Sequence, residues 1–509
     1  MLVTARDYHP WLASIPRGAP VEPLSAWIDR VPGERPAAIL PGEEVKSYAD
    51  LRRDRDRLAE WLGAHGVGAG DVVGVQLPNG WDFLVVHAAL ASVGAVMATL
   101  HRPYSATECR QLLETVDAVG WITEEDTQGW HWTRLTNRDN PSRQASGQDS
   151  LAPLALYFTS GTHSLTAKAC IHTHQSLLGN ALTVVSDAGM TADDVFISAS
   201  PFTHLFGVLS CHAAWVAGAP QAVVDRFDPA GFLQLAHKAQ ATVAFLVPTH
   251  VRDIVRYLQD HPDRPRPPLR EVRVAGAALP ADLVGEVQDR LGARVVNHWG
   301  MSELGAGTYT HWHDDPAVPA SSIGHPATGA RVRLVDADGR PITGAGETGE
   351  LWFTGPSLFY GYYGSPQLTE AALFREGETV WLKTGDQAAW HADGRLQYRG
   401  RLKDIVNRGG MKISALEVEN ALADFPGIRQ AAIVPIPDER LGERALLMVS
   451  LGEARSLTLD DIRRHLEQKG VARYKWPEFL EIREALPTTP TGKISKARLQ
   501  EELAVRVRD

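Results

Sequence analysis

The sequence predicts an α/β protein with a large N-terminal domain built on parallel-rich sheets and a small C-terminal α+β domain. The chain has 509 residues, which is more than one hydrophobic core usually organises. Up to about residue 320, strand-like segments alternate with helix-like segments. Beyond that point, short strands with alternating polarity and Asp-Gly turns follow one another.

The first part of the chain opens with a helix predicted over residues 45–66, because Ser47 can cap it and apolar residues recur at helical spacing. A strand over 72–77 and a helix over 82–93 come next. Further strands are predicted at 195–199, 222–224, 242–247, 272–275 and 294–298, with helices between them at 207–217, 229–239, 249–260 and 280–291. Helices of this length between strands predict parallel sheets with both faces covered.

The later part of the chain has shorter predicted strands and tight turns. Strands at 331–335, 350–354 and 397–399, with turns at Asp338-Gly339 and Asp393-Gly394, predict a small β-barrel-like part. Helices at 415–424 and 458–469 and strands at 431–436, 445–451 and 478–483 predict the small α+β domain. We therefore expect an N-terminal domain over 1–400, a charged linker at 401–404 and a C-terminal domain over 405–509.

Composition excludes several classes of protein. A formal net charge of −10 argues against a general nucleic-acid partner, which would need a basic surface. The three cysteines form no CxxC pair, so neither a zinc site nor a disulfide scaffold is indicated. No run approaches the roughly 20 apolar residues of a membrane span, and no secretion signal is evident. We expect a cytoplasmic protein.

A hydroxyl-rich loop follows an apolar strand that ends near Phe158. Its hydroxyls and backbone N–H groups could surround an anion, Gly161 allows the chain to curl, and a lysine adds positive charge. The candidate residues are Thr159, Ser160, Gly161, Thr162, His163 and Lys168. Such clusters are also common in solvent-exposed turns, which is the alternative interpretation. The Gly-Lys-Ser/Thr ending of a Walker A loop is absent.

This loop resembles the phosphate loop of the acyl- and aryl-adenylating (ANL) superfamily, which includes acyl-CoA synthetases, stand-alone adenylation domains and luciferases. That family usually reads Thr-Ser-Gly-Thr-Thr-Gly-x-Pro-Lys-Gly. This chain keeps the first four residues and the lysine, but has His163-Ser164 in place of Thr-Gly, lacks the proline and carries one extra residue before the lysine. The resemblance implies that the loop binds the phosphates of ATP.

Further segments of the larger domain carry the same resemblance. His204, in Pro201-Phe-Thr-His-Leu-Phe-Gly207, matches a histidine that borders the acid in the family, although a lone histidine is more often a packed core residue. Gly276, Ala277 and Ala278 resemble the turn beside adenine. The run Asn297, His298, Trp299, Gly300, Met301, Ser302 and Glu303 resembles a segment that supplies a stacking ring, a phosphate-binding hydroxyl and a carboxylate for Mg²⁺.

The C-terminal part completes the resemblance. Asp386 matches an aspartate that accepts hydrogen bonds from the ribose hydroxyls, Arg401 lies near the ribose or phosphates, and Lys403 is the hinge residue. Gly409 and Gly410 resemble the loop that lines the pantetheine tunnel. Lys493, in Pro487-Thr-Thr-Pro-Thr-Gly-Lys-Ile494, matches the catalytic lysine.

The resemblance implies an AMP-forming ligase. A carboxylic acid would react with ATP to give an acyl-adenylate and pyrophosphate. CoA would then form the thioester after the C-terminal domain, a mobile lid, rotates about a hinge at 401–404. Two alternatives remain open: transfer to a carrier-protein thiol or to an amine, and a non-catalytic nucleotide-binding protein. No long run of small residues indicates a fatty-acyl tunnel, which suggests a compact apolar or aromatic carboxylate. The residues that the resemblance places around the acid are His204, Val208, Ala277, His298, Met301, Gly305 and Ala306.

Overall fold

The computed structural model describes residues 21–124, 130–135, 149–159, 168–276, 279–409, 411–452, 456–489 and 493–506. The chain divides into two compact units. One contains residues 1–332 and 353–382, and the other contains residues 333–352 and 383–509. The hinge expected at 401–404 is not tested by this division and stays a prediction.

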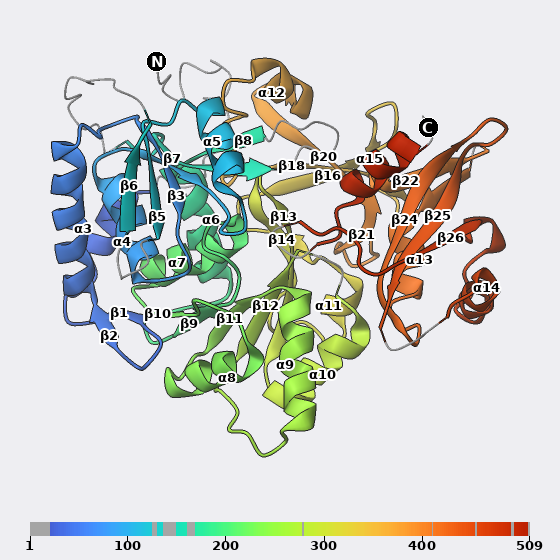
Figure 1. Ribbon diagram of the computed structural model, residues 1–509, viewed down its shortest axis with the longest axis horizontal. Helices are drawn as coiled ribbons and strands as arrows, with labels where there is room; N and C mark the ends of the chain where they lie inside the picture. The colour runs from blue at the N-terminus through green and yellow to red at the C-terminus, as the bar shows by residue number, and fades with distance from the viewer. Residues whose placement is uncertain are drawn as a thin grey trace. The chain divides into compact units, whose positions relative to one another are not determined.

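The larger unit contains a mostly parallel sheet (Figure 1). Its strands run in the spatial order β15 (His325–Pro326), β14 (Gly305–Tyr309), β13 (Arg294–Met301), β12 (Glu271–Ala275), β11 (Val243–Leu246), β9 (Phe196–Ser198), β10 (Gln221–Val223), β1 (Pro36–Ile39) and β2 (Val45–Ser47). Strands from β13 to β1 pair in parallel, whereas β14, β15 and β2 pair antiparallel with their neighbours.

Helices cover both faces of this sheet, as the sequence predicts. Side chains alternate along each strand, so Val295 packs on one face and Val296 on the other. The first face meets α8 (Pro229–Lys238), α9 (Pro248–Asp260) and α10 (Ala281–Leu291). The second meets α6 (His174–Asp187) and α7 (Leu205–Ala217). Strands buried on both faces account for the near-continuous apolar runs in the sequence.

A second sheet of the same unit runs in the order β6 (Trp130–Arg134), β5 (Gly120–Glu124), β3 (Val72–Gln76), β4 (Val96–Thr99), β7 (Pro153–Thr159) and β8 (Lys168–Thr173). Strands β5, β3, β4 and β7 are parallel, and β6 and β8 close its two ends antiparallel. Helices α2 (Leu24–Asp29), α3 (Tyr48–Ala64), α4 (Trp81–Ser92) and α5 (Ala106–Thr115) precede or connect these strands.

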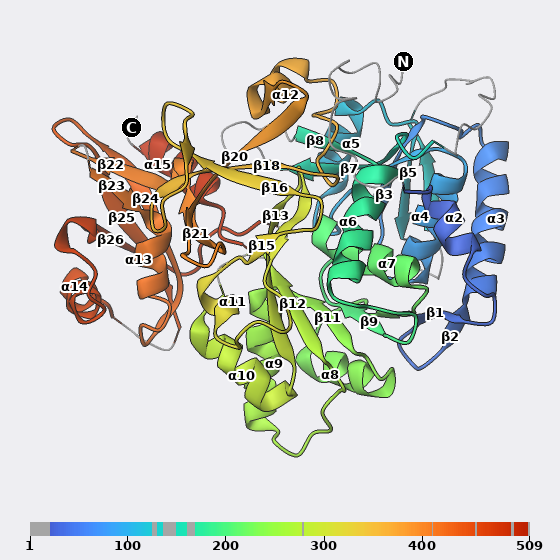
Figure 2. The same ribbon diagram turned by 180° about the vertical axis from the view of Figure 1, so that it is seen from behind.

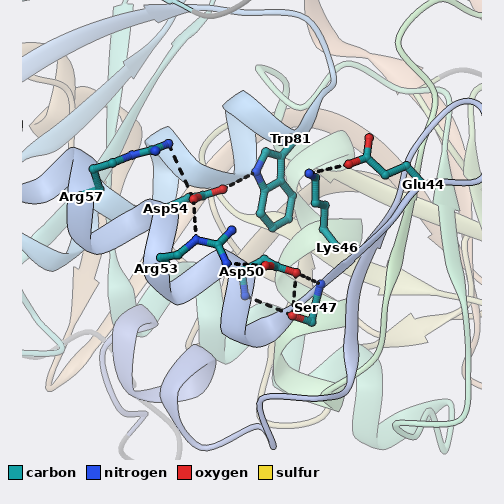
Figure 3. A network of polar contacts seen from close by, with 8 residues as sticks. All are labelled: Glu44, Lys46, Ser47, Asp50, Arg53, Asp54, Arg57 and Trp81. Carbon is teal, nitrogen blue, oxygen red and sulfur yellow. Dashed lines mark hydrogen bonds and ion pairs between the residues drawn. The ribbon is translucent and has the colours of Figure 1, made fainter.

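Polar contacts fix the start of α3 (Figure 3). Ser47 and Asp50 form a capping box, in which each residue's side chain accepts a hydrogen bond from the other's backbone N–H. Trp81 of α4 donates its indole N–H to Asp54 at 3.0 Å, which joins the two helices. The helix expected over 45–66 is therefore shorter than predicted, because residues 45–47 pair as β2 before the cap.

The remaining elements of the larger unit are short. They include α11 (Val318–Ser321), α12 (Pro366–Ala372) and β19 (Leu373–Glu376), which pairs with the first residues of β20 (Thr379–Trp390). Within the described part of the chain, no helix is both long and apolar enough to cross a membrane.

The smaller unit contains antiparallel pairs and an α+β layer (Figure 2). β16 (Arg331–Val335) pairs with β17 (Pro341–Ile342), and the end of β20 pairs with β21 (Leu396–Arg401); β18 spans Thr348–Thr354. A separate sheet has the order β23 (Met411–Ser414), β22 (Ile405–Arg408), β25 (Gly442–Leu451) and β24 (Ile428–Asp438), with β26 (Phe479–Arg483) parallel to β25.

Helices cover both faces of this last sheet. Ile433 and Leu447 pack on the side of α13 (Ala415–Ala421) and α14 (Leu459–Gln468). Val434 and Met448 pack on the side of α15 (Lys496–Arg506). The expected α+β unit is confirmed, and the two faces are built by the period-two alternation of β24 and β25.

Candidate active site

The expected phosphate loop connects β7 to β8. Thr159 and Lys168 are directly opposite each other in this antiparallel pair. The residues between them, including Ser160, Gly161, Thr162 and His163, lie outside the described residues. The pairing of β7 with β8 therefore places Thr159 and Lys168, the residues at the two ends of the loop, side by side.

Lys168 is linked to Glu303 through an aromatic residue that the sequence did not point to. The Lys168 Nζ lies 4.9 Å from the centre of the Tyr362 ring, a cation–π distance. The Tyr362 hydroxyl donates to Glu303 Oε1 at 2.8 Å. Burial and the negative charge of Glu303 raise the pKa of Tyr362, so the phenol keeps the proton that it donates.

Local packing explains why Tyr362 occupies this place. Its backbone N–H donates to Thr369 Oγ1 at 2.9 Å, and Gly361 beside it has a φ of +106°, which favours glycine. The Phe359 N–H donates to the Glu303 carbonyl at 2.8 Å, so the two segments are held together at the backbone as well. The Gly-Tyr-Tyr sequence at 361–363 is the signal that could have indicated this turn.

Glu303 is only 7% exposed and follows the end of β13. Among the described residues, no group of three His, Cys, Asp or Glu side chains is arranged to hold a metal ion by itself. A single buried carboxylate nevertheless fits Mg²⁺, which proteins commonly hold through one or two carboxylates together with substrate phosphates.

The β13 segment approaches its neighbours closely. A Cβ on Gly300 would lie 1.8 Å from the Gly305 carbonyl oxygen, so only glycine fits this register. The Trp299 ring is buried, and Met301 and Ser302 are half-buried. The Asn297 amide donates to the carbonyls of Pro319 and Ser322, both at 2.9 Å, so its donor group is already engaged within the protein.

His172 contacts the backbone of Ser302. Its Nε2 lies 2.7 Å from the Ser302 carbonyl oxygen, and its Nδ1 lies 3.1 Å from Ser176 Oγ. Burial lowers the pKa of His172 to about 4, so the ring is neutral at neutral pH. A neutral ring that donates through Nε2 accepts through Nδ1, which matches the two partners. Sequence reasoning missed His172 because its partner is 130 residues away.

His204 lies at the start of α7. Its Nδ1 accepts a hydrogen bond from the Phe206 N–H at 3.3 Å, and its ring stacks beside that of His101 at 6.1 Å. A Cβ on Gly207 would lie 2.0 Å from the Pro201 carbonyl oxygen, so glycine is required for this turn. The half-buried His204 ring is thus held in place by its own helix, at the carboxyl end of the β9 strand region.

His298 contacts the buried side chain of Arg273. Its Nε2 lies 3.0 Å from Arg273 Nη1, and its ring contacts those of Phe206 and Tyr309. Burial, and then the charge of Arg273, hold the pKa of His298 well below its ordinary value. On the next strand, Gly276 follows β12 with a φ of +105° and is exposed, while Ala277 and Ala278 lie outside the described residues.

In the smaller unit, Asp386 and Arg401 are paired across β20 and β21. The Arg401 Nε donates to Asp386 Oδ1 at 3.0 Å, and Asp386 is 3% exposed. Lys403 lies in the 3-10 turn Leu402–Asp404 that follows β21. Gly409 has a φ of +57° and donates its N–H to the Leu441 carbonyl at 2.7 Å; Gly410 lies outside the described residues.

Lys493 is brought into electrostatic range of Asp386 and Arg401, which lie in the same unit. Its pKa is lowered to about 8, first by burial of the ammonium and then by the charge of Arg401, while Asp386 acts in the opposite direction. The Lys493 residue as a whole is solvent-exposed, and water screens part of the effect of the neighbouring charges. The Thr489 N–H donates to the Lys493 carbonyl at 2.6 Å, and the Lys493 N–H donates to Thr489 Oγ1 at 3.2 Å.

Comparison with known proteins identifies the family of this chain. Residues 24–363 match the AMP-binding enzyme family, and residues 417–493 match the AMP-binding enzyme C-terminal domain. The chain is 30% identical over 498 residues to the medium-chain fatty-acid–CoA ligase of Escherichia coli (strain K12), over 91% of this chain and 86% of that protein.

A second relative and a solved structure extend the comparison. The chain is 29% identical over 512 residues to a salicyl-AMP ligase / salicyl-S-ArCP synthetase of Mycobacterium tuberculosis (strain ATCC 25618 / H37Rv), over 94% of this chain and 89% of that protein. The structure of ATP-bound MatB from Rhodopseudomonas palustris shares the fold, with a TM-score of 0.82 at 24% identity over 94% of this chain and 98% of that one. The chain therefore belongs to the AMP-binding enzyme family of the adenylate-forming superfamily and is an AMP-forming acid–thiol ligase.

Proposed function

We propose that the chain uses ATP to convert a compact apolar or aromatic carboxylic acid into an acyl-adenylate, with release of pyrophosphate, and then forms the CoA thioester. The observation that carries this proposal is the grouping of Lys493, Arg401 and Asp386 in one unit. A cation of lowered pKa beside a buried carboxylate has the features expected of an active-site group.

The acid must be activated because a carboxylate is a poor electrophile. Its oxygen attacks the α-phosphorus of ATP, the bond to the bridging oxygen breaks, and pyrophosphate leaves with the electron pair. Negative charge develops around the α-phosphate, where the Lys493 ammonium stabilises it. Removing one such preorganised donor costs about 2.7–4 kcal/mol of transition-state stabilisation in enzymes of comparable design.

The remaining residues hold the nucleotide in this proposal. Asp386 accepts hydrogen bonds from the ribose hydroxyls, and Arg401, bonded to it, lies beside the ribose or phosphates. Lys168 and the hydroxyls of its loop bind the outer phosphates, and Gly276 and Trp299 flank the adenine. Glu303 would hold Mg²⁺, which supplies positive charge to the phosphates when bound. Tyr362 keeps the Glu303 carboxylate oriented.

The second step requires the thiol of CoA to reach the acyl carbon. We propose that residues 405–509, which bear Lys493, turn about Lys403, so that the catalytic lysine is replaced by the Gly409–Gly410 loop, which would line the path of the pantetheine arm. Domain motions of this kind are commonly absorbed by backbone changes at a few hinge residues.

A carrier-protein thiol is the second candidate acceptor, because a relative of similar coverage is named both salicyl-AMP ligase and salicyl-S-ArCP synthetase. Purified protein separates the candidates. Acids are screened for pyrophosphate release, first alone and then with free CoA. Thioester formation with free CoA supports the first acceptor. Adenylate formation without any CoA thioester contradicts it and favours a carrier protein or an amine.

A further inference from the structure

One face of the larger unit's mostly parallel sheet holds buried charges where apolar side chains are expected. Arg273 of β12 lies between Phe245 of β11 and Val296 of β13 in the strand register. Phe245 and Val296 both belong to the core that α6 and α7 cover. Paired residues share a face of a sheet, so Arg273 points into this same core, where it is 2% exposed.

The buried arginine is balanced by a chain of ion pairs. Arg273 Nη2 lies 2.8 Å from Glu271 Oε2, Arg270 Nη1 lies 2.5 Å from Glu271 Oε1, and Arg270 Nε lies 3.0 Å from Asp194 Oδ1. Glu271 is fully buried. Two basic and two acidic side chains alternate along this chain of ion pairs, so their formal charges cancel.

Arg273 fixes the tautomer of His298. A guanidinium group donates hydrogen bonds and cannot accept them. The His298 Nε2, at 3.0 Å from Arg273 Nη1, must therefore accept. A neutral imidazole that accepts at Nε2 carries its proton on Nδ1. His298 Nδ1 is thus a donor, and it is buried without a hydrogen-bond partner among the described residues.

An unsatisfied buried donor is costly and calls for an explanation. His298 is 4% exposed and lies in the last half of β13, toward the carboxyl end of a parallel strand. Ligands of open α/β sheets bind at these strand ends. Its ring lies 5.6 Å from that of Phe206, which is in the first turn of α7, two residues after His204.

We propose that the Nδ1–H of His298 binds a hydrogen-bond acceptor on the acid substrate, and that Arg273 is the positioning residue that keeps this proton in place. This inference rests on the ligase activity proposed above and narrows its substrate class. The acceptor is uncharged, such as a hydroxyl, carbonyl or ether oxygen or a ring nitrogen. A second carboxylate would be buried against a neutral ring and a charge-balanced network, with no counter-charge.

The specificity test uses matched pairs of aryl carboxylates. Benzoate is compared with hydroxybenzoates and with pyridine carboxylates, in which an oxygen or a ring nitrogen is added at one position. We expect the parent enzyme to favour at least one acceptor-bearing acid by about tenfold or more in kcat/KM, because the donor is otherwise unsatisfied. In His298→Leu the ratio falls to about one, and in His298→Asn, whose amide N–H can stand near Nδ1, part of it returns.

His261→Leu is the matched control. This histidine is exposed at the end of α9, where its ring stacks on Tyr257, and its replacement leaves the ratio unchanged. An undiminished preference in His298→Leu, or no preference for any acceptor-bearing acid in the parent, would overturn the proposal.

A substrate-free measurement separates this inference from the activity. Nitrogen NMR of histidine-labelled protein, assigned with His298→Leu, reports the ring tautomer directly. We expect a neutral Nδ1–H tautomer from pH 6 to 8, and in Arg273→Met a shift toward the Nε2–H form. An Nε2–H or charged ring in the parent refutes the role of His298. Absence of pyrophosphate release with every acid refutes the ligase activity instead.

Discussion

At the residue scale, the lowered pKa of Lys493 gives a pH dependence. The pKa is lowered from 10.5 to about 8, so the ammonium is present below about pH 8 and is lost as the pH rises through that value. Adenylate formation should therefore decline on the alkaline side of about pH 8 in kcat/KM, which reports the free enzyme.

The matched variant is Lys493→Arg, because a guanidinium stays charged throughout this range. Pyrophosphate release by this variant is expected to be slower, because the planar guanidinium group cannot occupy the place of the ammonium. The rate should not decline on the alkaline side. An identical decline in the variant would assign the titration to another group.

Tyr362 gives a second prediction at this scale. Tyr362→Phe removes the donor to Glu303 Oε1 and leaves the ring under Lys168. Partners of a metal-binding carboxylate commonly contribute 10- to 100-fold to metal affinity or activity. We therefore expect the dissociation constant for Mg²⁺-ATP, measured by calorimetry, to rise by about tenfold. Tyr257→Phe, on helix α9, is the control, and an unchanged constant in Tyr362→Phe would contradict the role of the phenol.

The sequence points to residues that stand in a recognisable segment, and it misses residues whose contacts depend on a distant partner. Asp386 and Arg401 were expected at the nucleotide and lie together. Tyr362, His172 and Arg273 were not expected, because each acts through a residue on another element. Asn297 was expected to touch the nucleotide, and its amide is already engaged by two carbonyls.

At the element scale, the start of α3 is stabilised by its capping box. Ser47→Ala removes the hydroxyl that accepts from the Asp50 N–H, which typically costs about 1 kcal/mol. Amide exchange in the first turn of α3 should accelerate by roughly fivefold, because 1.4 kcal/mol corresponds to a factor of ten. Mass spectrometry of that peptide measures it.

The Ser105–Glu108 capping box of α5 is the internal control, and Ser47→Thr keeps a hydroxyl. Hydrogen bonds from the Ser47 backbone and side chain, and then from Arg53, lower the pKa of Asp50 to about 2. The stabilisation contributed by the Asp50 carboxylate is complete above the ordinary aspartate pKa of 3.8 and is lost as the pH falls through about 2.

Equal amide exchange at the start of α3 in the parent and in Ser47→Ala would contradict the role of the cap.

Element boundaries show where local signals end and pairing begins. The sequence predicted a strand at 294–298, whereas β13 runs on to Met301 because it pairs with β14. The sequence did not predict β14, since Gly305 and Gly307 weaken a strand pattern. Glycine nevertheless fits there, because a Cβ on Gly305 would lie 2.6 Å from Asn180 Oδ1 and a Cβ on Gly307 would lie 2.7 Å from the Leu304 side chain.

At the scale of the whole molecule, the α/β fold with a large and a small domain could be predicted from alternating segments and is confirmed. The hinge remains a prediction. If the two half-reactions use different orientations of the lid, single substitutions should separate them. Lys403→Pro, which fixes φ at the pivot, should slow thioester formation from a supplied acyl-adenylate more than it slows adenylate formation.

Leu402→Pro, one position earlier in the same turn, tests whether a proline at a neighbouring position has the same effect. Stopped-flow assays of the two half-reactions measure each step. Equal losses of both steps in Lys403→Pro would show that it is not the pivot.

The most direct test of the account is carboxylate-dependent pyrophosphate release by the parent and by Lys493→Ala, across aliphatic, alicyclic and aromatic acids. We predict that at least one acid drives release in the parent, and that Lys493→Ala loses it by 100-fold or more, about the cost of one preorganised donor, while still converting a supplied acyl-adenylate to the CoA thioester. Release by Lys493→Ala at the parent rate would contradict the account.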